Sequence, residues 1–339
     1  MRGKPWLVLS ILVAMATTAS GQLPPQATFA TQLASQYQMA SNVTYRTASN
    51  QQLKMDVYYR RGVTTPQPTL VYMHGGFWVA GAKETAILGL VPWMEMGWNV
   101  VNVEYRLGVA TDVSTLAPAA VGDCFCALRF VAGSAAAYNI DVNRLVVTGE
   151  SAGGHLALAM GMISEDAVFG KKECAGSAAP ARGGAAGGAG ARGAAPAGAA
   201  NAPATPATPV ALPPMPRIAA VINWFGITDV PDVIEGPNRQ AAAVRWFGDL
   251  PNALEIARKV SPLTYVRAGL PPIITIHGDA DRTVPYPEAV RLHQELAKVN
   301  VPNQLVTVPG GGHGGFTAEE RVKIYVTIRE FLAKNGLGQ

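Results

Sequence analysis

The sequence has little charge and few cysteines, and these shortages exclude several classes of protein. Charged residues make up 15% of its 339 positions and hydrophobic residues 49%, which is typical of a globular α/β domain and not of a disordered or fibrous chain. The three cysteines, Cys124, Cys126 and Cys174, lack the ligand spacing of a zinc site. Cys124 and Cys126 are poor partners for each other on a helix, but Cys174 could pair with either in an oxidising compartment.

The sequence also lacks an apolar run long enough to span a bilayer. The nearest candidate, Leu7 to Ala16, falls short of the ~20 residues that a spanning helix needs, which disfavours a membrane anchor. Arg2 and Lys4 precede it and the small residues Ala19-Ser20-Gly21 follow it, as in a secretory signal peptide. We expect a signal peptide at residues 1–21, cleavage before Gln22, and a secreted or periplasmic mature chain that does not insert into a membrane.

A basic surface for nucleic acid is missing as well. The formal net charge is +4, but two of the basic residues belong to the expected signal peptide. Arg182 and Arg192 lie in a segment without acidic residues, at 175–214, which is almost entirely Ala, Gly, Pro and Thr. The remaining body is close to neutral, so no nucleic-acid partner is expected.

Strand-like and helix-like runs alternate along residues 22–339, which predicts a single α/β domain with a mostly parallel sheet. Segment 175–214 interrupts this pattern and cannot bury enough apolar surface to fold, so we interpret it as a disordered insert, with a lid or tether as the alternative. The expected strands are Val43–Thr47 and Leu53–Tyr59 (an opening hairpin), Thr69–Met73, Asn99–Glu104, Leu145–Thr148, Ala219–Trp224, Ile273–Ile276 and Gln304–Val308. The expected helices are Thr85–Met96, Pro118–Tyr138, Ala152–Ile163, Glu288–Val299 and Ala318–Lys334.

A G-x-S-x-G motif lies at the junction of one expected strand and the next helix. It reads Gly149-Glu150-Ser151-Ala152-Gly153-Gly154. On such a sharp turn the neighbours of the serine must be small, and the helix start places free backbone N–H groups beside it. A chance match is possible for the motif alone, but the strand, motif and helix together predict that Ser151 is a nucleophile.

A second glycine turn, His74-Gly75-Gly76-Phe77-Trp78, follows the strand Thr69–Met73. Acyl transfer places negative charge on the carbonyl oxygen, and fixed N–H donors must stabilise that charge. By itself the turn could be an ordinary glycine loop. Together with the downstream serine it predicts an oxyanion hole formed by the N–H groups of Gly76, Phe77 and Ala152.

A serine nucleophile needs a histidine base and an acid that orients it. Of the five histidines, His313 alone lies on a glycine-flanked loop directly after the last strand, at the sheet edge where α/β proteins place their sites. We expect His293 at the surface, His155 in a packing or hydrogen-bonding role and His74 as a brace of the glycine turn. His277 ends a strand just before the loop that should carry the acid. The acid should follow the strand Ile273–Ile276, where Asp279 and Asp281 both qualify from the residues alone.

Together these motifs resemble the α/β-hydrolase carboxylesterases of the lipase/esterase type, and most of all the branch of bifunctional feruloyl and acetyl-xylan esterases. The resemblance runs from about Lys54 to about Leu332 and rests on the four motifs HGGFW (74–78), GESAGG (149–154), HGDADRTVP (277–285) and GGGHGGF (310–316). The order Ser, Asp, His also matches this fold. The chain departs from the three-glycine form HGGG by having Phe77, and its insert has no counterpart.

The resemblance implies an α/β-hydrolase fold, with an antiparallel hairpin at the N-terminal edge of the sheet. It also implies a serine carboxylesterase that needs no metal or cofactor and acts on small-molecule or polysaccharide-linked esters of acetyl or feruloyl type. Asp281 becomes the acid, Asp279 becomes structural, and Cys126 becomes the preferred partner of Cys174. Of the candidate pocket residues Trp78, Trp224, Trp246, Phe247 and Phe316, we expect Trp78 and Phe316 to contact substrate.

Two other functions are possible for a chain with these motifs. A serine exopeptidase or amidase on the same fold usually carries a large extra domain. Without the signal peptide and the insert, roughly 280 residues remain, the size of one domain. A non-catalytic binding protein on a hydrolase scaffold would be expected to lack a triad residue, whereas Ser151, Asp281 and His313 are all present.

Overall fold

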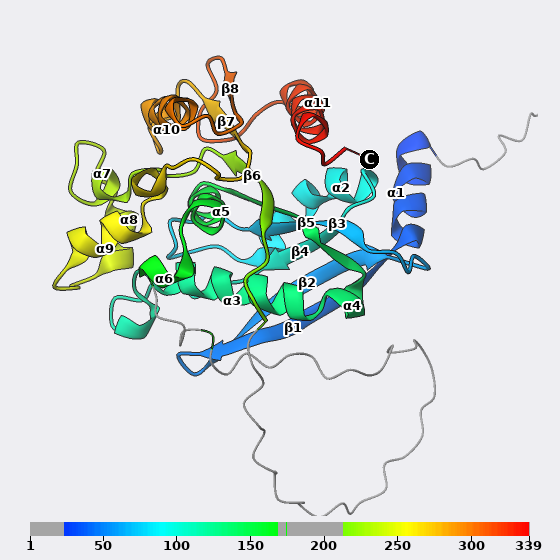
Figure 1. Ribbon diagram of the computed structural model, residues 1–339, viewed down its shortest axis with the longest axis horizontal. Helices are drawn as coiled ribbons and strands as arrows, with labels where there is room; N and C mark the ends of the chain where they lie inside the picture. The colour runs from blue at the N-terminus through cyan, green and yellow to red at the C-terminus, as the bar shows by residue number, and fades with distance from the viewer. Residues whose placement is uncertain (1–23, 169–173, 175–212, 339) are drawn as a thin grey trace, which may run out of the picture.

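An eight-stranded sheet runs through the computed structural model, with strand order β1-β2-β4-β3-β5-β6-β7-β8 (Figure 1). The structure describes residues 24–168, 174 and 213–338. The expected signal peptide at 1–21 and residues 175–212 of the expected insert lie outside them. The strands are β1 (Tyr37–Ala48), β2 (Gln51–Arg60), β3 (Gln67–Met73), β4 (Asn99–Val103), β5 (Ile140–Glu150), β6 (Ile218–Trp224), β7 (Ile273–Gly278) and β8 (Asn303–Val308).

The direction of the strands confirms the predicted architecture. β1 and β2 form an antiparallel hairpin, and β2 pairs antiparallel with β4. From β4 onward every pairing is parallel. Parallel strands that are buried on both faces are near-continuously apolar, as the run Leu70-Val71-Tyr72-Met73 illustrates.

Two layers of helices cover the sheet (Figure 1). Successive side chains of a strand point to opposite faces, so Leu70 and Tyr72 pack in one core while Val71 and Met73 pack in the other. α2 and α11 cover the first face; α3, α5 and α10 cover the second. The helices that bear on the argument are α1 (Pro25–Gln36), α2 (Ile87–Glu95), α3 (Ala119–Gly133), α4 (Ala135–Tyr138), α5 (Ala152–Met162), α10 (Tyr286–Lys298) and α11 (Ala318–Lys334).

Some expected helices differ from those in the structure. The single helix predicted over Pro118–Tyr138 is two helices, α3 and α4, which are separated at Ser134. The preceding Gly133 is a poor helix former and packs so closely on Pro213 that an added Cβ would lie 2.9 Å from its ring. The helix predicted from Thr85 begins as a 3₁₀ turn, and α2 starts only at Ile87.

Five helices of the described residues were not predicted. They are α1 at the start of the described chain, α6 (Glu165–Val168) after α5, and three short helices between β6 and β7: α7 (Val230–Ile234), α8 (Ala241–Phe247) and α9 (Ala253–Val260). The three short helices have only five to eight residues. Helices of that length are shorter than the ten to twelve residues by which a sequence pattern distinguishes a helix from other segments.

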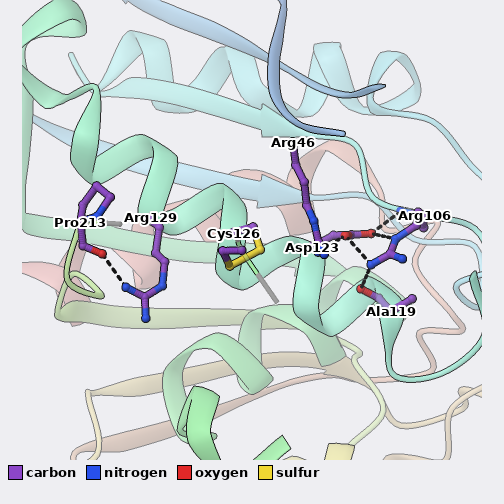
Figure 2. Close-up of a disulfide and its surroundings, with 8 residues drawn as sticks. Arg46, Arg106, Ala119, Asp123, Cys126, Arg129 and Pro213 are labelled. Carbon is purple, nitrogen blue, oxygen red and sulfur yellow. Dashed lines mark hydrogen bonds and ion pairs between the residues drawn. A yellow bond between two sulfur atoms is a disulfide. The ribbon is translucent and has the colours of Figure 1, made fainter. Parts of the chain in front are cut away.

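α3 carries two links to distant parts of the chain (Figure 2). A disulfide joins Cys126 to Cys174, with a Cα separation of 5.3 Å, while Cys124 is a buried free thiol. One turn before the disulfide, the fully buried Asp123 accepts hydrogen bonds from Arg46 and Arg106. These contacts hold α3 against β1 and the segment after β4.

Within the described ranges, no helix combines the length and apolar composition that crossing a bilayer requires.

Candidate active site

Five segments that follow parallel strands meet at the carboxyl edge of the sheet. The strands are β3, β5, β6, β7 and β8, and the segments after them carry Gly76, Ser151, Phe225, Asp281 and His313. Ligand sites of open α/β sheets lie at this edge. The structure therefore gathers the nucleophile, acid, base and oxyanion candidates from residues that are up to 237 positions apart in sequence.

Ser151 lies on a strained turn between β5 and α5. Its backbone angles are φ 56° and ψ −119°, a combination that non-glycine residues rarely adopt. The turn is held by a hydrogen bond from the Ser151 N–H to the Trp224 carbonyl and one from the His155 N–H to the Ser151 carbonyl. Gly153 has no room for a side chain, because an added Cβ would lie 2.0 Å from the Met73 carbonyl oxygen.

His313 and Asp281 form a direct hydrogen bond. Nδ1 of His313 lies 2.7 Å from Oδ2 of Asp281, and only the ring nitrogen can donate to a carboxylate. The His313 side chain is 22% exposed, whereas that of Asp281 is fully buried. The bond therefore orients the imidazole from the inside and leaves Nε2 as the nitrogen available to a substrate or a nucleophile.

Asp281 is surrounded by hydrogen-bond donors. Its Oδ1 accepts the N–H groups of Thr283 and Val284, at 2.7 and 3.0 Å. Nε2 of His277 lies 3.2 Å from Oδ2. Burial by itself raises the pKa of Asp281. The bonds from His277, His313 and Thr283 stabilise the carboxylate more strongly, so the pKa lies well below its usual value. Asp281 is therefore ionised throughout the neutral range.

Asp279, the other carboxylate of this loop, has a different role. Its Oδ1 accepts the Gly310 N–H at 2.6 Å and so ties the loop after β7 to the loop after β8. It is exposed, and among the described residues the carboxylate that bonds to His313 is that of Asp281. Between the two candidates that the residues left open, the structure brings Asp281 to the histidine.

The glycine turn after β3 has the backbone that an oxyanion hole requires. Gly76 and Phe77 have φ of 117° and 48°, and a Cβ at Gly76 would lie 2.1 Å from the Ala80 carbonyl oxygen. No hydrogen bond within the described residues uses the N–H of either Gly76 or Phe77. Ala152 is the first residue of α5, where helical N–H groups also lack an intrahelical acceptor.

His74 and Tyr105 brace this turn from behind. The His74 ring stacks on Tyr105 with ring centroids 4.3 Å apart, and its Nδ1 donates to the Gly75 carbonyl at 2.8 Å. The Tyr105 hydroxyl in turn donates to the His74 carbonyl at 2.8 Å. Burial lowers the pKa of His74, so its imidazole is neutral at pH 7. His74 has the bracing role that the sequence predicts.

A cavity of about 310 Å³ opens between these groups. Within the described residues, no hydrogen bond joins the Ser151 hydroxyl to His313, although both residues line this cavity. Such bonds are often long before substrate binds. The full lining is Gly75, Gly76, Phe77, Glu150, Ser151, Phe225, His313, Gly314, Gly315 and Arg321.

The two aromatic residues expected to contact substrate do not line this cavity. Trp78 is fully buried, donates from Nε1 to His155 at 3.1 Å, and stacks on Trp246 at 4.2 Å. Its backbone has a positive φ of 59°, and its side chain lies in the core. Phe316 is 7% exposed and packs at 5.9 Å behind Phe225, which does line the cavity. The prediction for both residues was wrong, since both side chains are buried outside the lining of the cavity.

The remaining histidines have structural surroundings. His155 accepts the Trp78 bond at Nδ1 and donates from Nε2 to the Val260 carbonyl, and burial lowers its pKa to about 4. His293 was expected at the surface, but it is buried and pairs with Asn303 at 2.9 Å. That prediction was wrong because α10 packs this side against β8.

The sequence analysis assigned no place in the site to Phe225, Glu150 or Arg321, nor did it place His277 beside Asp281. Phe225 follows β6 with φ 39°, and its ring lies 4.7 Å from that of His313. Glu150 is the variable residue of the G-x-S-x-G motif, so its position beside the serine was readable. Arg321 reaches the cavity from α11, and nothing in its local sequence signals that.

No three His, Cys, Asp or Glu side chains of the described residues form a group that could hold a metal ion.

The sheet topology, the serine turn and the order of the three candidate residues define an α/β-hydrolase. Residues 55–296 match the BD-FAE family, and the chain belongs to this family of esterases. Esterase LipC of Mycobacterium tuberculosis is 25% identical over 273 residues, which cover 77% of this chain and 56% of LipC. Carboxylesterase NlhH of the same organism is 34% identical over 111 residues, which cover 32% of this chain and 34% of NlhH. The chain thus spans about half of one relative and a third of the other.

Solved structures share the fold. Esterase Est2 of Thermogutta terrifontis superposes with a TM-score of 0.63 at 23% identity, covering 89% of this chain and 93% of that one. The same enzyme phosphorylated by paraoxon superposes with a TM-score of 0.61 at 21% identity, covering 89% and 95%.

Proposed function

We propose that this protein is a carboxylesterase that works through a covalent acyl-enzyme on Ser151. One observation carries the proposal: Ser151 and His313 line a single cavity, and Asp281 holds His313 from behind at 2.7 Å. This is the arrangement of nucleophile, base and orienting acid that acyl transfer uses. Membership of an esterase family supports it independently.

In the proposed reaction the Ser151 hydroxyl attacks the ester carbonyl, and Nε2 of His313 takes the hydroxyl proton. The same proton then passes to the leaving alcohol, and an acyl-serine remains. His313 next activates a water molecule that hydrolyses the acyl-serine and restores the enzyme. Throughout the cycle the ionised Asp281 keeps the ring in the correct tautomer and stabilises the imidazolium.

The oxyanion is stabilised by backbone donors. The N–H groups of Gly76 and Phe77 lack other acceptors among the described residues, and that of Ala152 opens a helix. Donors that are fixed before the reaction need no reorganisation as charge develops, so each contributes a large share of the rate. The strained turn at Ser151 and the braced turn after His74 supply this rigidity.

The substrate class proposed is esters of short acyl or aromatic acids, of acetyl and feruloyl type. The BD-FAE family match supports this class, and so does the small cavity of about 310 Å³. Solved forms of the Thermogutta terrifontis esterase carry propionate and butyrate. Short-chain esters are therefore the first substrates to test, with methyl ferulate and acetyl-xylan beside them.

We also propose that the mature chain is exported. The residues at 1–21 have the pattern of a cleavable signal peptide, and the Cys126–Cys174 disulfide suits an oxidising compartment. Mass spectrometry of the protein from the periplasm and medium of an expressing bacterium tests this. A mature form that begins at Gln22 is expected, and an uncleaved intracellular chain would contradict it.

The mechanism is tested by Ser151→Ala. Hydrolysis of p-nitrophenyl acetate should fall by on the order of 10⁶, as for the nucleophile of subtilisin, and paraoxon should no longer attach. Ser164→Ala, at an exposed serine just beyond α5, is the matched control and should keep full activity. Peptide mapping should place the phosphoryl group on Ser151. More than a few per cent of residual activity in Ser151→Ala would contradict the assignment.

A further inference from the structure

A second and larger cavity lies next to the candidate active site. Its volume is about 770 Å³, against about 310 Å³ for the cavity at Ser151. It opens between α2 and α11, which lie side by side in Figure 1. Its lining residues are Tyr72, Gly75, Thr85, Ala86, Leu88, Gly89, Pro92, Trp93, Thr148, Glu150, Trp224, Ala318, Arg321, Val322 and Tyr325.

The two cavities adjoin each other and share three lining residues. Gly75, Glu150 and Arg321 line both of them. Glu150 directly precedes Ser151, and an added Cβ at Gly75 would lie 3.4 Å from the Ser151 Cβ. A group attached to an ester at Ser151 therefore needs to pass only these three residues to enter the larger cavity.

The inner wall of the larger cavity is aromatic. The ring of Tyr325 on α11 lies 6.2 Å from that of Trp93 on α2 and 5.8 Å from that of Trp224 at the end of β6. The Tyr325 hydroxyl donates to the Gly89 carbonyl at 3.1 Å and so fixes the distance between the two helices. The wall is therefore preformed, and it offers the ring faces and edges that bind apolar and aromatic groups.

The mouth of the larger cavity is apolar as well. Leu88 of α2 is 85% exposed and Val322 of α11 is 64% exposed, and both line the opening. Among the lining residues only Glu150 and Arg321 are charged, and both lie at the junction with the active site. Exposed apolar residues that gather around a concave aromatic surface mark a binding site for an uncharged group.

We infer that the cavity between α2 and α11 is a subsite for a bulky, uncharged apolar group of the ester, which enters from Ser151 past Glu150 and Arg321. The inference rests on the proposed esterase function, since a cavity that shares Gly75, Glu150 and Arg321 with the cavity at Ser151 lies within reach of an ester bound there. It accounts for the size difference between the cavities. The cavity at Ser151 holds the reacting ester, and the larger one selects for what is attached to it.

Gly89→Phe tests the subsite by filling it. Gly89 lines the cavity from α2, and an added Cβ meets nothing within 4 Å, so the backbone accepts the side chain. Ile87→Phe is the matched control, because Ile87 is on the same helix, 38% exposed and outside the lining. Val322→Trp blocks the cavity from α11 and replaces Gly89→Phe if that variant does not fold.

Three esters distinguish the two sides of the ester bond: methyl acetate, 2-naphthyl acetate and methyl 2-naphthylacetate. For each variant, kcat/KM of a naphthyl ester is divided by that of methyl acetate. The ratio should fall at least tenfold in Gly89→Phe for one of the naphthyl esters and less than twofold in Ile87→Phe. The ester affected shows whether the alcohol or the acyl group occupies the subsite. Unchanged ratios for both would overturn the inference.

A binding measurement separates this inference from the proposed function. Trp93 and Trp224 line the cavity, so 2-naphthol bound there should quench tryptophan fluorescence saturably. Quenching should be lost in Gly89→Phe and kept in Ile87→Phe, whether or not any ester is hydrolysed. If the wild-type protein hydrolyses esters but shows neither quenching nor a ratio change, the subsite is wrong and the esterase function stands. If the wild-type protein hydrolyses no ester and paraoxon does not phosphorylate Ser151, the proposed function is wrong.

Discussion

His313 donates from Nδ1 to Oδ2 of Asp281 across 2.7 Å, and this bond joins the loops after β8 and β7. Because Asp281 also accepts two backbone N–H groups and lies 3.2 Å from His277, its carboxylate cannot rotate away from the imidazole. The acid is thus locked in place before substrate arrives, and the tautomer of His313 is fixed with it.

Asp281→Asn should remove most of the activity without unfolding the protein. An amide can present its N–H₂ to His313 and favour the wrong tautomer, which costs on the order of 10⁴ in kcat in the serine protease case. The measurement is kcat for p-nitrophenyl acetate, with the melting temperature as the check on folding.

Asp279→Asn is the control for that prediction. Its Oδ1 accepts one N–H, from Gly310, and an amide oxygen can still do so. We expect less than a fivefold loss of kcat. A larger loss in Asp279→Asn than in Asp281→Asn would show that the acid was assigned to the wrong carboxylate.

The lowered pKa of Asp281 makes a prediction about pH. A depressed pKa means that the carboxylate loses its charge only well below its usual range, so it remains ionised wherever the enzyme works. Asp281 should then add no proton uptake to the acid side of the profile, where log(kcat/KM) should rise with a slope no greater than one. Kinetics from pH 4 to pH 9 measure this, and a slope of two would contradict it.

Much of the site was readable from the sequence because it is made of short local motifs. The turn at Ser151 and the turn after His74 are each contiguous in sequence, and the positive φ of Ser151 and Gly76 belongs to the backbone of its own segment. Gly153 is an exception, because the Met73 carbonyl oxygen of another strand leaves no room for a side chain there. The apolar strands before the two turns fix their position at the carboxyl edge of the sheet. These parts depend on neighbours in sequence, which is why pattern and structure agree.

The parts that were missed depend on neighbours in space. Trp78 is held in the core by a bond to His155, 77 positions away, and by stacking on Trp246. Arg321 reaches the cavity only because α11 packs beside α2, and no local period announces that. The pocket walls therefore could not be assigned from residue type.

Trp78→Phe should cost stability more than activity. The change leaves Nδ1 of the fully buried His155 as an acceptor without its donor. This should lower the free energy of unfolding by about 1–3 kcal/mol. In a domain of this size that lowers the melting temperature by several degrees. KM for p-nitrophenyl acetate should change less than threefold, since the indole lies outside the cavity. A large change in KM at an unchanged melting temperature would restore Trp78 to the substrate pocket.

The disulfide should contribute strongly to stability. Cys126 and Cys174 are 48 positions apart, and closing a loop of that length stabilises the folded chain by roughly 4 kcal/mol in the chain-entropy treatment. The double variant Cys126→Ala/Cys174→Ala should therefore melt about 10 °C lower. Thiol titration of the unfolded, unreduced wild-type protein should find one free thiol, that of Cys124. Three free thiols would show that the bond does not form.

Glu288 should make the stability of the fold depend on pH. Its Oε2 accepts the N–H groups of Thr228 and Asp229, at 2.9 and 3.1 Å, while Oε1 is buried without a partner among the described residues. Burial raises the pKa of Glu288 to about 7, despite the opposing effect of these two bonds. At neutral pH the carboxyl group is thus close to half protonated.

The sign of this effect follows from proton binding. Between a pKa of roughly 4.3 in the unfolded chain and about 7 in the folded one, the folded state binds more protons. The stability that this group contributes is therefore complete below the pKa of the unfolded chain, falls as pH rises towards the pKa of the folded one, and levels off above that pKa.

Glu288→Gln keeps an oxygen for the two N–H groups and cannot titrate. In urea unfolding, the free energy of unfolding of Glu288→Gln, taken relative to that of the wild type, should rise by roughly 3 kcal/mol from pH 5 to pH 8. Glu295→Gln, at an exposed carboxylate of the same helix, should show no such gain. If the difference between Glu288→Gln and the wild type is the same at every pH, Glu288 does not titrate in this range.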